Sequence, residues 1–290
     1  MNSTQFAAWL QPPMPITSMY QRKPLIMGVL NVTPDSFSDG GRFFETNHAI
    51  QHAQTMIEQG ADIIDIGGES SRPGAQPIDC EEELRRVIPV IEGIRAISDI
   101  MISIDTQKAA VMKSAVASGA SMINDIYALQ GPDALSSAAR LNVTVSLMHM
   151  QGTTNAMHTN PTYTQPVVEE INDFFNNRIS ACLDAGIKHS NLILDPGIGF
   201  GKSVQHNLNI LNQLSAFQRH KLPLLLGVSR KSTIGIITNK PVLERVPAGI
   251  ATAVFATLQG VNIIRTHDIS ETKQALDMID AIKEQGKKHD

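Results

Sequence analysis

The 290-residue sequence is poor in several residue types that mark particular classes of protein. It has two cysteines, Cys80 and Cys182, too few for a disulfide framework or a four-thiolate zinc site. Aromatic residues are 4% of the chain, with one tryptophan, so we do not expect nucleic-acid bases to stack on rows of exposed rings. No run approaches the ~20 apolar residues of a membrane span, and residues 1–23 lack the apolar core of a signal peptide. The sequence predicts a cytoplasmic protein without a membrane or nucleic-acid partner.

Neither sign of charge is in large excess. Lys and Arg total 24 against 28 for Asp and Glu, which gives a net charge of −4. A mildly acidic chain has no general attraction for nucleic acid or anionic lipid. Any anionic ligand must therefore be held by a local cluster of basic side chains.

Short apolar runs rich in β-branched residues recur along the whole chain. Most are apolar throughout, as in parallel strands that are covered by helices. They are Leu25–Val32, Asp62–Ile66, Met101–Ile104, Met122–Ile126, Val143–Met148, Leu192–Leu194, Leu224–Val228 and Asn262–Arg265.

Segments with helical patterns lie between these runs, and several end on a glycine shortly before the next run. Examples of helical segments are Glu81–Ile97, Gln107–Ser118, Pro166–Ala185 and Ala248–Gln259. Glycine just after a helix adopts the left-handed cap conformation readily. Eight rounds of strand and helix in 290 residues predict a TIM (β/α)8 barrel over residues 24–283, with an N-terminal extension (1–23) and a C-terminal tail (284–290). A doubly wound sheet is the alternative, but it normally has fewer strands for this length.

Every predicted strand ends on polar residues or is followed by them. They are Asn31, Glu69, Arg72, Asp105, Asn124, Asp125, His149, Asp195, Ser229, Arg230, Lys231, Arg265 and His267. Asp, Asn and Ser are common in turns, so each one taken alone is more simply a turn residue. A full set at the carboxyl ends of the strands predicts an active site there.

The types of these residues indicate the ligand. Four basic side chains would meet at one mouth and bind an anion: Arg72, Lys231, Arg265 and His267. Carboxylates and an amide, from Asp105, Asp195 and Asn124, suit a planar heterocycle edge that carries several N–H groups.

Three loops have sequences that suggest special roles. Residues 33–46 and 70–80 are long loops after strands, and such loops often form lids. Residues 197–203 (GIGFGKS) look like a phosphate-binding P-loop, but Pro196 stands where that motif needs glycine. These glycines are better explained by a tight turn that lets the backbone approach a ligand.

Eight motifs resemble, in order, those of the dihydropteroate synthase family. They are NVTPDSFSDGG (31–41), DIGGESSRPG (65–74), SIDT (103–106), NDI (124–126), LMHMQG (147–152), DPGIGFGK (195–202), SRKS (229–232) and RTHD (265–268). The resemblance spans about residues 24–283, with one motif at each strand end. Two departures are Ser71, where the family often has Thr, and Ile198, where Phe is common.

The resemblance implies an enzyme of folate biosynthesis and a target of sulfonamides, usually a homodimer. It would join 6-hydroxymethyl-7,8-dihydropterin pyrophosphate to p-aminobenzoate, with Mg²⁺ assisting the release of pyrophosphate. The implied pterin contacts are Asp105, Asn124, Met148, Asp195, Gly227 and Lys231. Pyrophosphate is assigned to Asn31, Arg265 and His267, with Asn31 also at the metal. The implied p-aminobenzoate contacts are Phe37, Ser71, Arg72, Pro73, Phe200, Lys231 and Ser232, and the implied catalytic residues are Asp105, Lys231, Asp39 and Arg72.

Two other functions are alternatives for a sequence with these motifs. A methyltetrahydrofolate-type methyltransferase keeps the pterin-binding residues but lacks the NVTPDSFSDGG string and the SRPG segment. A non-catalytic pterin-binding paralogue would have lost Lys231 or Arg265, and both are present.

Overall fold

Eight parallel strands form the centre of the molecule. The structure is a computed structural model that describes residues 1–11, 22–33, 41–70, 75–152 and 161–286. The strands are β1 (Leu25–Asn31), β2 (Ile63–Gly67), β3 (Met101–Asp105), β4 (Met122–Asp125), β5 (Thr144–Met148), β6 (Leu192–Asp195), β7 (Leu225–Gly227) and β8 (Ile263–Thr266).

The strands follow one another around a barrel. Their order is β6-β5-β4-β3-β2-β1-β8-β7, and all neighbours pair in parallel. A parallel bridge between Leu194 and Leu224 joins β6 to the chain just before β7, so the two edges of the sheet meet. The predicted TIM barrel is confirmed, and the doubly wound alternative is wrong.

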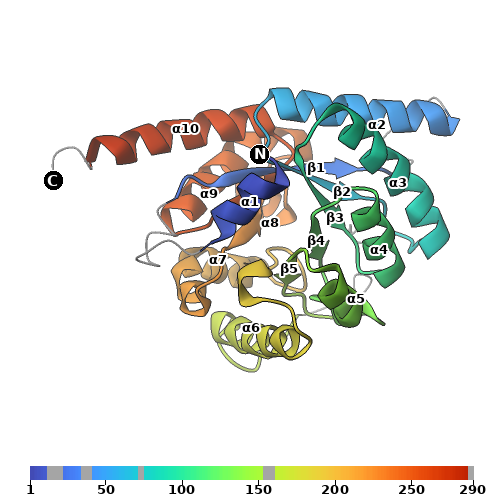
Figure 1. The fold of residues 1–290 in the computed structure, drawn as a ribbon. Helices are drawn as coiled ribbons and strands as arrows, with labels where there is room; N and C mark the ends of the chain where they lie inside the picture. Colours follow the sequence, from blue (N-terminus) through green and yellow to red (C-terminus); the bar gives the residue numbers. More distant parts are fainter. Residues whose placement is uncertain (12–21, 34–40, 71–74, 153–160, 287–290) are drawn as a thin grey trace.

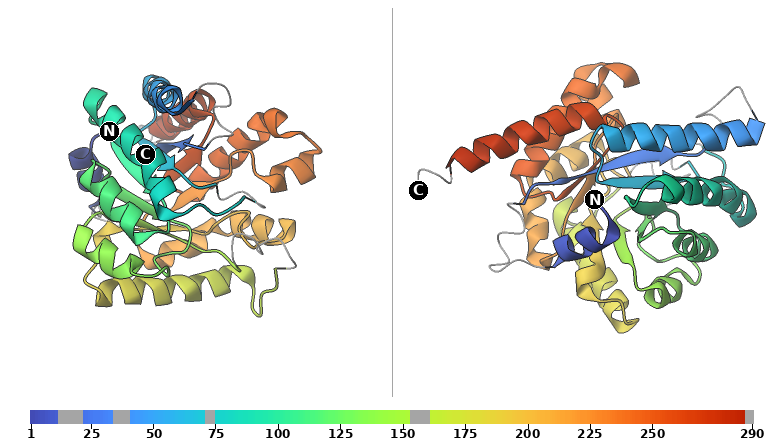
Figure 2. Two further views of the ribbon diagram at one scale, coloured as in Figure 1. Left: turned by 90° about the vertical axis from the view of Figure 1, so that its right-hand side faces the viewer. Right: turned by 45° about the horizontal axis from the view of Figure 1, so that its top comes forward.

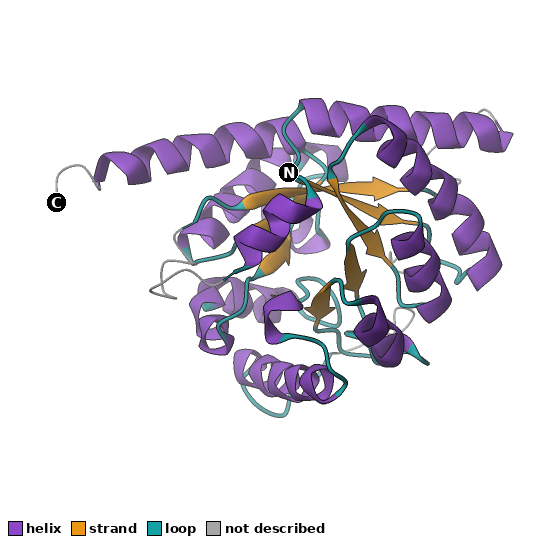
Figure 3. Cartoon of the chain, in the orientation of Figure 1, coloured by secondary structure: helices purple, strands orange, loops and turns teal. Residues whose placement is uncertain are grey.

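Helices surround the strands on the outside (Figures 1 and 3). They are α2 (Gly41–Glu58), α3 (Cys80–Ile97), α4 (Ala109–Ala117), α5 (Ala134–Leu141), α6 (Val167–Asp184), α7 (Val204–Asn212), α8 (Ser232–Thr238), α9 (Val246–Leu258) and α10 (Ile269–Gly286). Short 3-10 turns occupy His189–Asn191, Leu214–His220 and Val242–Glu244. The four helical segments expected from the sequence are confirmed. The segment 33–46 is not a loop throughout, because α2 already begins at Gly41.

The apolar strands are buried on both faces, which explains why their sequences do not alternate. Side chains such as Ile64 and Ile102 pack outward against the helices. Others, such as Met27 and Ile63, fill the barrel near the beginnings of the strands. Burial on both sides is the normal environment of a parallel strand.

A helix within the N-terminal extension closes the barrel at that end. Helix α1 (Ser3–Leu10) buries Phe6 and Leu10 against the inner residues of the strands. Asn2 caps it, because the Asn2 side chain accepts from the Gln5 N–H and the Gln5 side chain accepts from the Asn2 N–H. Because the carbonyl of Met1 accepts a hydrogen bond from the backbone of Met101 (2.8 Å), the helix lies where the strands begin.

The opposite end of the barrel, where the strands have their carboxyl ends, is therefore formed by the polar strand ends and the loops that follow them. The two further views show the helices around the strands and α10 projecting beyond the barrel (Figure 2). None of the helices in the described ranges combines the length and apolar character needed to cross a bilayer.

Candidate active site

A pocket opens at the carboxyl ends of the strands, where the sequence predicts the site. It is lined by Asp105, Asn124, Ile126, Met148, Asp195, Gly197, Ile198, Phe200, Gly227, Lys231 and Arg265. All six residues expected to contact a pterin are in this set. Strand pairing explains the convergence: Asp105 pairs in register with Asn124, Met148 with Asp195, and Gly227 with Arg265.

An ion network spans the floor of the pocket. Arg265 on β8 donates from Nε to Asp65 Oδ2 (2.6 Å) and from Nη2 to Asp105 Oδ2 (2.8 Å). Asn124 on β4 donates from Nδ2 to the same Asp65 oxygen (3.1 Å). Burial raises the pKa of Asp105 to about 7, although the charge of Arg265 opposes this shift. The network therefore joins β2, β3, β4 and β8 through three charged groups and one amide, with Asp65 fully buried at its centre.

A carboxylate and an ammonium lie on the other side of the pocket. Asp195 Oδ1 accepts the backbone N–H of Gly197 (2.7 Å), while burial raises the pKa of the Asp195 carboxyl. Burial lowers the pKa of Lys231 to about 8. The Lys231 ammonium stands 4.1 Å from the centre of the Phe200 ring, a cation–π contact. Phe200 and Lys231, both expected at the p-aminobenzoate subsite, are therefore neighbours.

The glycine-rich loop 197–201 packs against the chain after β5. A side chain at Gly197 would lie 2.0 Å from the carbonyl oxygen of His149, and one at Gly201 would lie 2.2 Å from that of Gln151. Both glycines have positive φ (68° and 63°). Gly197 lines the pocket. The close approach that Gly197 and Gly201 permit in this structure is to the backbone of His149 and Gln151.

A buried lysine fixes this packing. Lys202 Nζ donates to the carbonyl oxygens of Phe200 (2.9 Å) and His149 (3.1 Å) and lies 2.9 Å from His149 Nδ1. Burial lowers the pKa of Lys202 to about 7 and that of His149 to about 2. With its ammonium held by these groups, Lys202 fixes the loop that carries Phe200.

The residues expected to contact pyrophosphate lie on neighbouring strands. Asn31 ends β1 beside Gly67, where an added Cβ would be 3.7 Å from both Asn31 Oδ1 and Asp105 Oδ2. His267 follows β8, and its Nδ1 is 3.1 Å from Ser229 Oγ. Asn31 and Arg265 thus flank Asp105. Ser232 begins α8 and does not line the pocket.

Five predicted site residues lie outside the described part of the chain. They are Phe37, Asp39, Ser71, Arg72 and Pro73. Their placement in the site stays a prediction.

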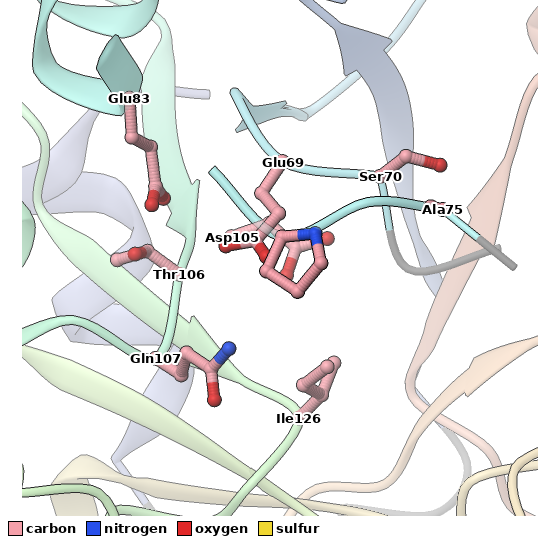
Figure 4. A pocket seen from close by; sticks show the side chains of 9 residues that line it. Glu69, Ser70, Ala75, Glu83, Asp105, Thr106, Gln107 and Ile126 are labelled. Carbon is pink, nitrogen blue, oxygen red and sulfur yellow. The ribbon is translucent and has the colours of Figure 1, made fainter. Parts of the chain in front are cut away.

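A second hollow adjoins the pocket on the side of α3 (Figure 4). It shares Asp105 and Ile126 with the first pocket and is also lined by Glu69 and Glu83. Lys108, after β3, forms ion pairs with both glutamates. One lysine therefore offsets part of the charge of the two glutamates. Within the described ranges, no group of three or more His, Cys, Asp or Glu side chains is arranged to hold a metal ion.

Two residues that organise this site, Asp65 and Lys202, are not among those that the sequence predicts to act there. Asp65 belongs to the DIGGESSRPG motif, and a charged residue inside the apolar run 62–66 is the signal in the sequence that could identify it. A buried carboxylate needs a partner, and Asp65 is fully buried against Arg265. Lys202 lies in the segment 197–203 that resembles a P-loop, and its sequence context does not indicate that it is buried against His149.

Known proteins resemble this chain over most of its length. A family model described as "Pterin binding enzyme" matches residues 27–267. Dihydropteroate synthase of Escherichia coli K12 is 48% identical over 265 residues, which cover 91% of this chain and 94% of that protein. The Yersinia pestis dihydropteroate synthase in complex with a sulfonamide drug has a TM-score of 0.85 at 47% identity, covering 91% of this chain and 95% of that one.

A third similar protein was solved with a pteroate. The Xanthomonas albilineans dihydropteroate synthase in complex with 7,8-dihydropteroate has a TM-score of 0.82 at 42% identity, covering 90% of this chain and 94% of that one. The identity, the coverage and the shared barrel agree with the motifs and with the pocket at the strand ends. The chain belongs to the dihydropteroate synthase family of pterin-binding enzymes.

Proposed function

We propose that this chain joins 6-hydroxymethyl-7,8-dihydropterin pyrophosphate to p-aminobenzoate, giving 7,8-dihydropteroate and pyrophosphate. The observation that carries the proposal is the single pocket shared by Asp105, Asn124, Asp195, Lys231 and Arg265. It combines acceptors for a heterocycle with cations for an anionic leaving group. The catalytic domain proposed here is residues 24–283, between the extension 1–23 and the tail 284–290.

The proposed pterin subsite is the floor of the pocket. Asp195 and Asn124 face the cavity from β6 and β4 and supply acceptors and an amide donor for the ring edge. Gly227 leaves room for a flat ring, and Met148 forms an apolar wall. Asp105 lies where its carboxylate opposes the positive charge that develops on the pterin as the leaving group departs.

The proposed leaving-group subsite is formed by Arg265, His267 and Asn31. Departure of pyrophosphate requires neutralisation of its charge, which Arg265 supplies from a fixed position. Asn31 offers one oxygen at this edge, and Mg²⁺ is often held by few protein oxygens together with substrate phosphates. The residues therefore fit Mg²⁺ that enters with the substrate. Bound there, it would neutralise charge on the pyrophosphate oxygens.

The proposed p-aminobenzoate subsite is nearer the rim. Phe200 and Lys231 are in contact there, so an aromatic acid could pack on the ring while its carboxylate approaches the ammonium. Ser232 follows directly in the chain. The remaining members of this proposed subsite are Phe37, Ser71, Arg72 and Pro73, and Asp39 and Arg72 complete the proposed catalytic set. The aromatic amine is neutral at pH 7, so no strong general base is required. Sulfonamides are expected to compete at this subsite.

A homodimer is part of the proposal. Exposed apolar side chains gather on α8, α9 and α10 and on the turn between α8 and α9: Ile236, Ile237, Leu243, Phe255, Leu258, Met278 and Ile282. Leu243 is 78% exposed and Ile236 is 66% exposed. Apolar surface concentrated on adjacent elements is typical of a subunit interface.

Substitution of Lys231 tests the proposed site. Lys231→Ala removes the ammonium that contacts Phe200 and faces Asp195, so we expect product formation to fall by at least about 100-fold, as for loss of a positioned electrostatic group. Pterin affinity, measured by calorimetry, should fall as well. Lys240→Ala, at an exposed lysine outside the pocket, is the matched control. Near-normal turnover of Lys231→Ala would contradict the site.

A further inference from the structure

We propose that Asp65 is a positioning residue that sets Arg265 and Asn124 together and so couples the leaving-group subsite to the pterin subsite. One oxygen, Oδ2, accepts from Arg265 Nε at 2.6 Å and from Asn124 Nδ2 at 3.1 Å. These partners lie on β8 and β4, on either side of β2 in the strand order. This inference rests on the proposed function.

Asp65 holds the guanidinium in one orientation. Arg265 donates two bonds from different nitrogens, Nε to Asp65 and Nη2 to Asp105. A planar group that is held at two corners cannot rotate about its stem, and its plane is thereby fixed. Without Asp65, Arg265 would keep only the contact with Asp105, which itself faces the substrate in the proposed function.

The same carboxylate orients the Asn124 amide. Because Nδ2 donates to Asp65, the amide oxygen is directed away from that bond and is available to other donors. Asn124 lines the pocket, so the orientation decides which amide atom a pterin meets. One buried carboxylate thus sets the geometry of a cation and an amide that serve different parts of the proposed substrate.

Stability alone is a weak reason for this arrangement. Asp65 is 0% exposed and Arg265 is 22% exposed at its side chain, so the pair loses most of its hydration. Buried ion pairs are often no more stable than apolar residues of the same volume. The ion pair therefore fixes the geometry of the pocket, while it adds little to the free energy of unfolding.

A double-mutant cycle tests the proposal. In Asp65→Asn the charge is lost but the shape is kept, and we expect kcat to fall on the order of 10- to 100-fold, the size expected for a charged hydrogen bond. In the Arg265→Ala background, the added Asp65→Asn change should alter kcat by less than about 2-fold, because the positioned group is gone. Equal losses in both backgrounds would overturn the proposal.

A binding arm separates the two partners. Affinity for 6-hydroxymethyl-7,8-dihydropterin, which lacks pyrophosphate, should fall in Asp65→Asn in the presence and in the absence of the Arg265 side chain, because this effect passes through Asn124. It should not fall further when Asp65→Asn is added to Asn124→Ala. An unchanged affinity in Asp65→Asn would overturn the coupling.

Two variants control for folding. Asp125→Asn changes another buried carboxylate, one that binds the backbone N–H groups of Tyr127 and Leu129 and does not line the pocket. Its effect on kcat should be the same with and without Arg265. If Asp65→Asn does not fold, Asp65→Glu keeps the charge but shifts the carboxylate, and the same cycle with Arg265→Ala applies. Wild-type pyrophosphate release is measured first: if it fails, the proposed function fails; if it succeeds while Asp65→Asn is normal, this inference alone fails.

Discussion

Single buried charged residues fix the positions of several groups in the site. Lys202 is 6% exposed, and its ammonium is held by two carbonyls and an imidazole. Asp65 makes the corresponding contacts for Arg265 and Asn124. In both cases at least one partner lies far away in the sequence: His149 is 53 residues from Lys202, and Arg265 is 200 residues from Asp65.

Lys202 predicts a particular dependence of stability on pH. Its pKa is about 7 in the folded protein against 10.5 in the unfolded chain. Between these values the unfolded state binds more protons at this residue, so the free energy of unfolding rises with pH. The slope from this group is about 1.4 kcal/mol per pH unit. Below about pH 7 the group is protonated in both states and adds no slope.

Urea unfolding of wild type and Lys202→Met from pH 6 to pH 9 measures this contribution. The stability of the wild type relative to Lys202→Met should increase above pH 7. Lys240→Met, at an exposed lysine, should show no such trend. A difference between wild type and Lys202→Met that stays constant with pH would show that Lys202 titrates as an ordinary lysine.

At the scale of elements, the strands could be predicted from the sequence. The side chains that meet at their ends could be predicted only in part. Each strand is a short apolar run, and the rule that parallel strands end together placed Asp105, Asn124 and Asp195 at one pocket. The role of Asp65 was not predictable in this way, because it depends on which side chains face each other across the barrel. The role of Lys202 was not predictable either, because the residue lies in a segment that resembles a P-loop without being one.

Helix α1 was missed for a different reason. It has eight residues, too short to be stable by itself, and its only strong local signal is the cap at Asn2. Its stability comes from Phe6 and Leu10 packing on the inner ends of the strands. The sequence around α1 does not reveal these contacts, because the strands that Phe6 and Leu10 touch are distant in the chain.

The packing of α1 makes a testable prediction. Phe6 is 1% exposed inside the barrel, so Phe6→Ala should lower the free energy of unfolding by about 3–5 kcal/mol. The helix lies at the end opposite the pocket, so turnover of the folded protein at 25 °C should stay close to wild type. Thr4→Ala, on the exposed face of α1, is the control in the same urea titrations. An equal effect of both substitutions would mean that α1 does not cover the core.

At the scale of the whole molecule, charge and surface have separate roles. A net charge of −4 gives no general attraction for anions, yet Lys231 and Arg265 converge on one pocket. The barrel gathers basic groups that are far apart in the chain. The apolar surface on α8, α9 and α10 lies outside this pocket and is proposed to pair two copies.

The proposed dimer is tested by placing a charge in that surface. Leu258→Glu, at a side chain 56% exposed on α9, should convert a dimer to a monomer in sedimentation velocity, because a buried unpaired carboxylate is costly. Leu183→Glu, at an exposed leucine on α6, should leave the sedimentation coefficient unchanged. A dimer that persists in Leu258→Glu, or a wild type that sediments as a monomer, would contradict the proposed interface.

The most direct test of the proposed reaction is pyrophosphate release by the purified wild type. The protein is incubated with 6-hydroxymethyl-7,8-dihydropterin pyrophosphate and Mg²⁺, with and without p-aminobenzoate, and pyrophosphate and 7,8-dihydropteroate are both quantified. We predict that release is stimulated by the amine, matches 7,8-dihydropteroate one for one in its presence, and stops when EDTA removes the metal. Absence of 7,8-dihydropteroate, or release that is indifferent to p-aminobenzoate, would contradict the proposed reaction.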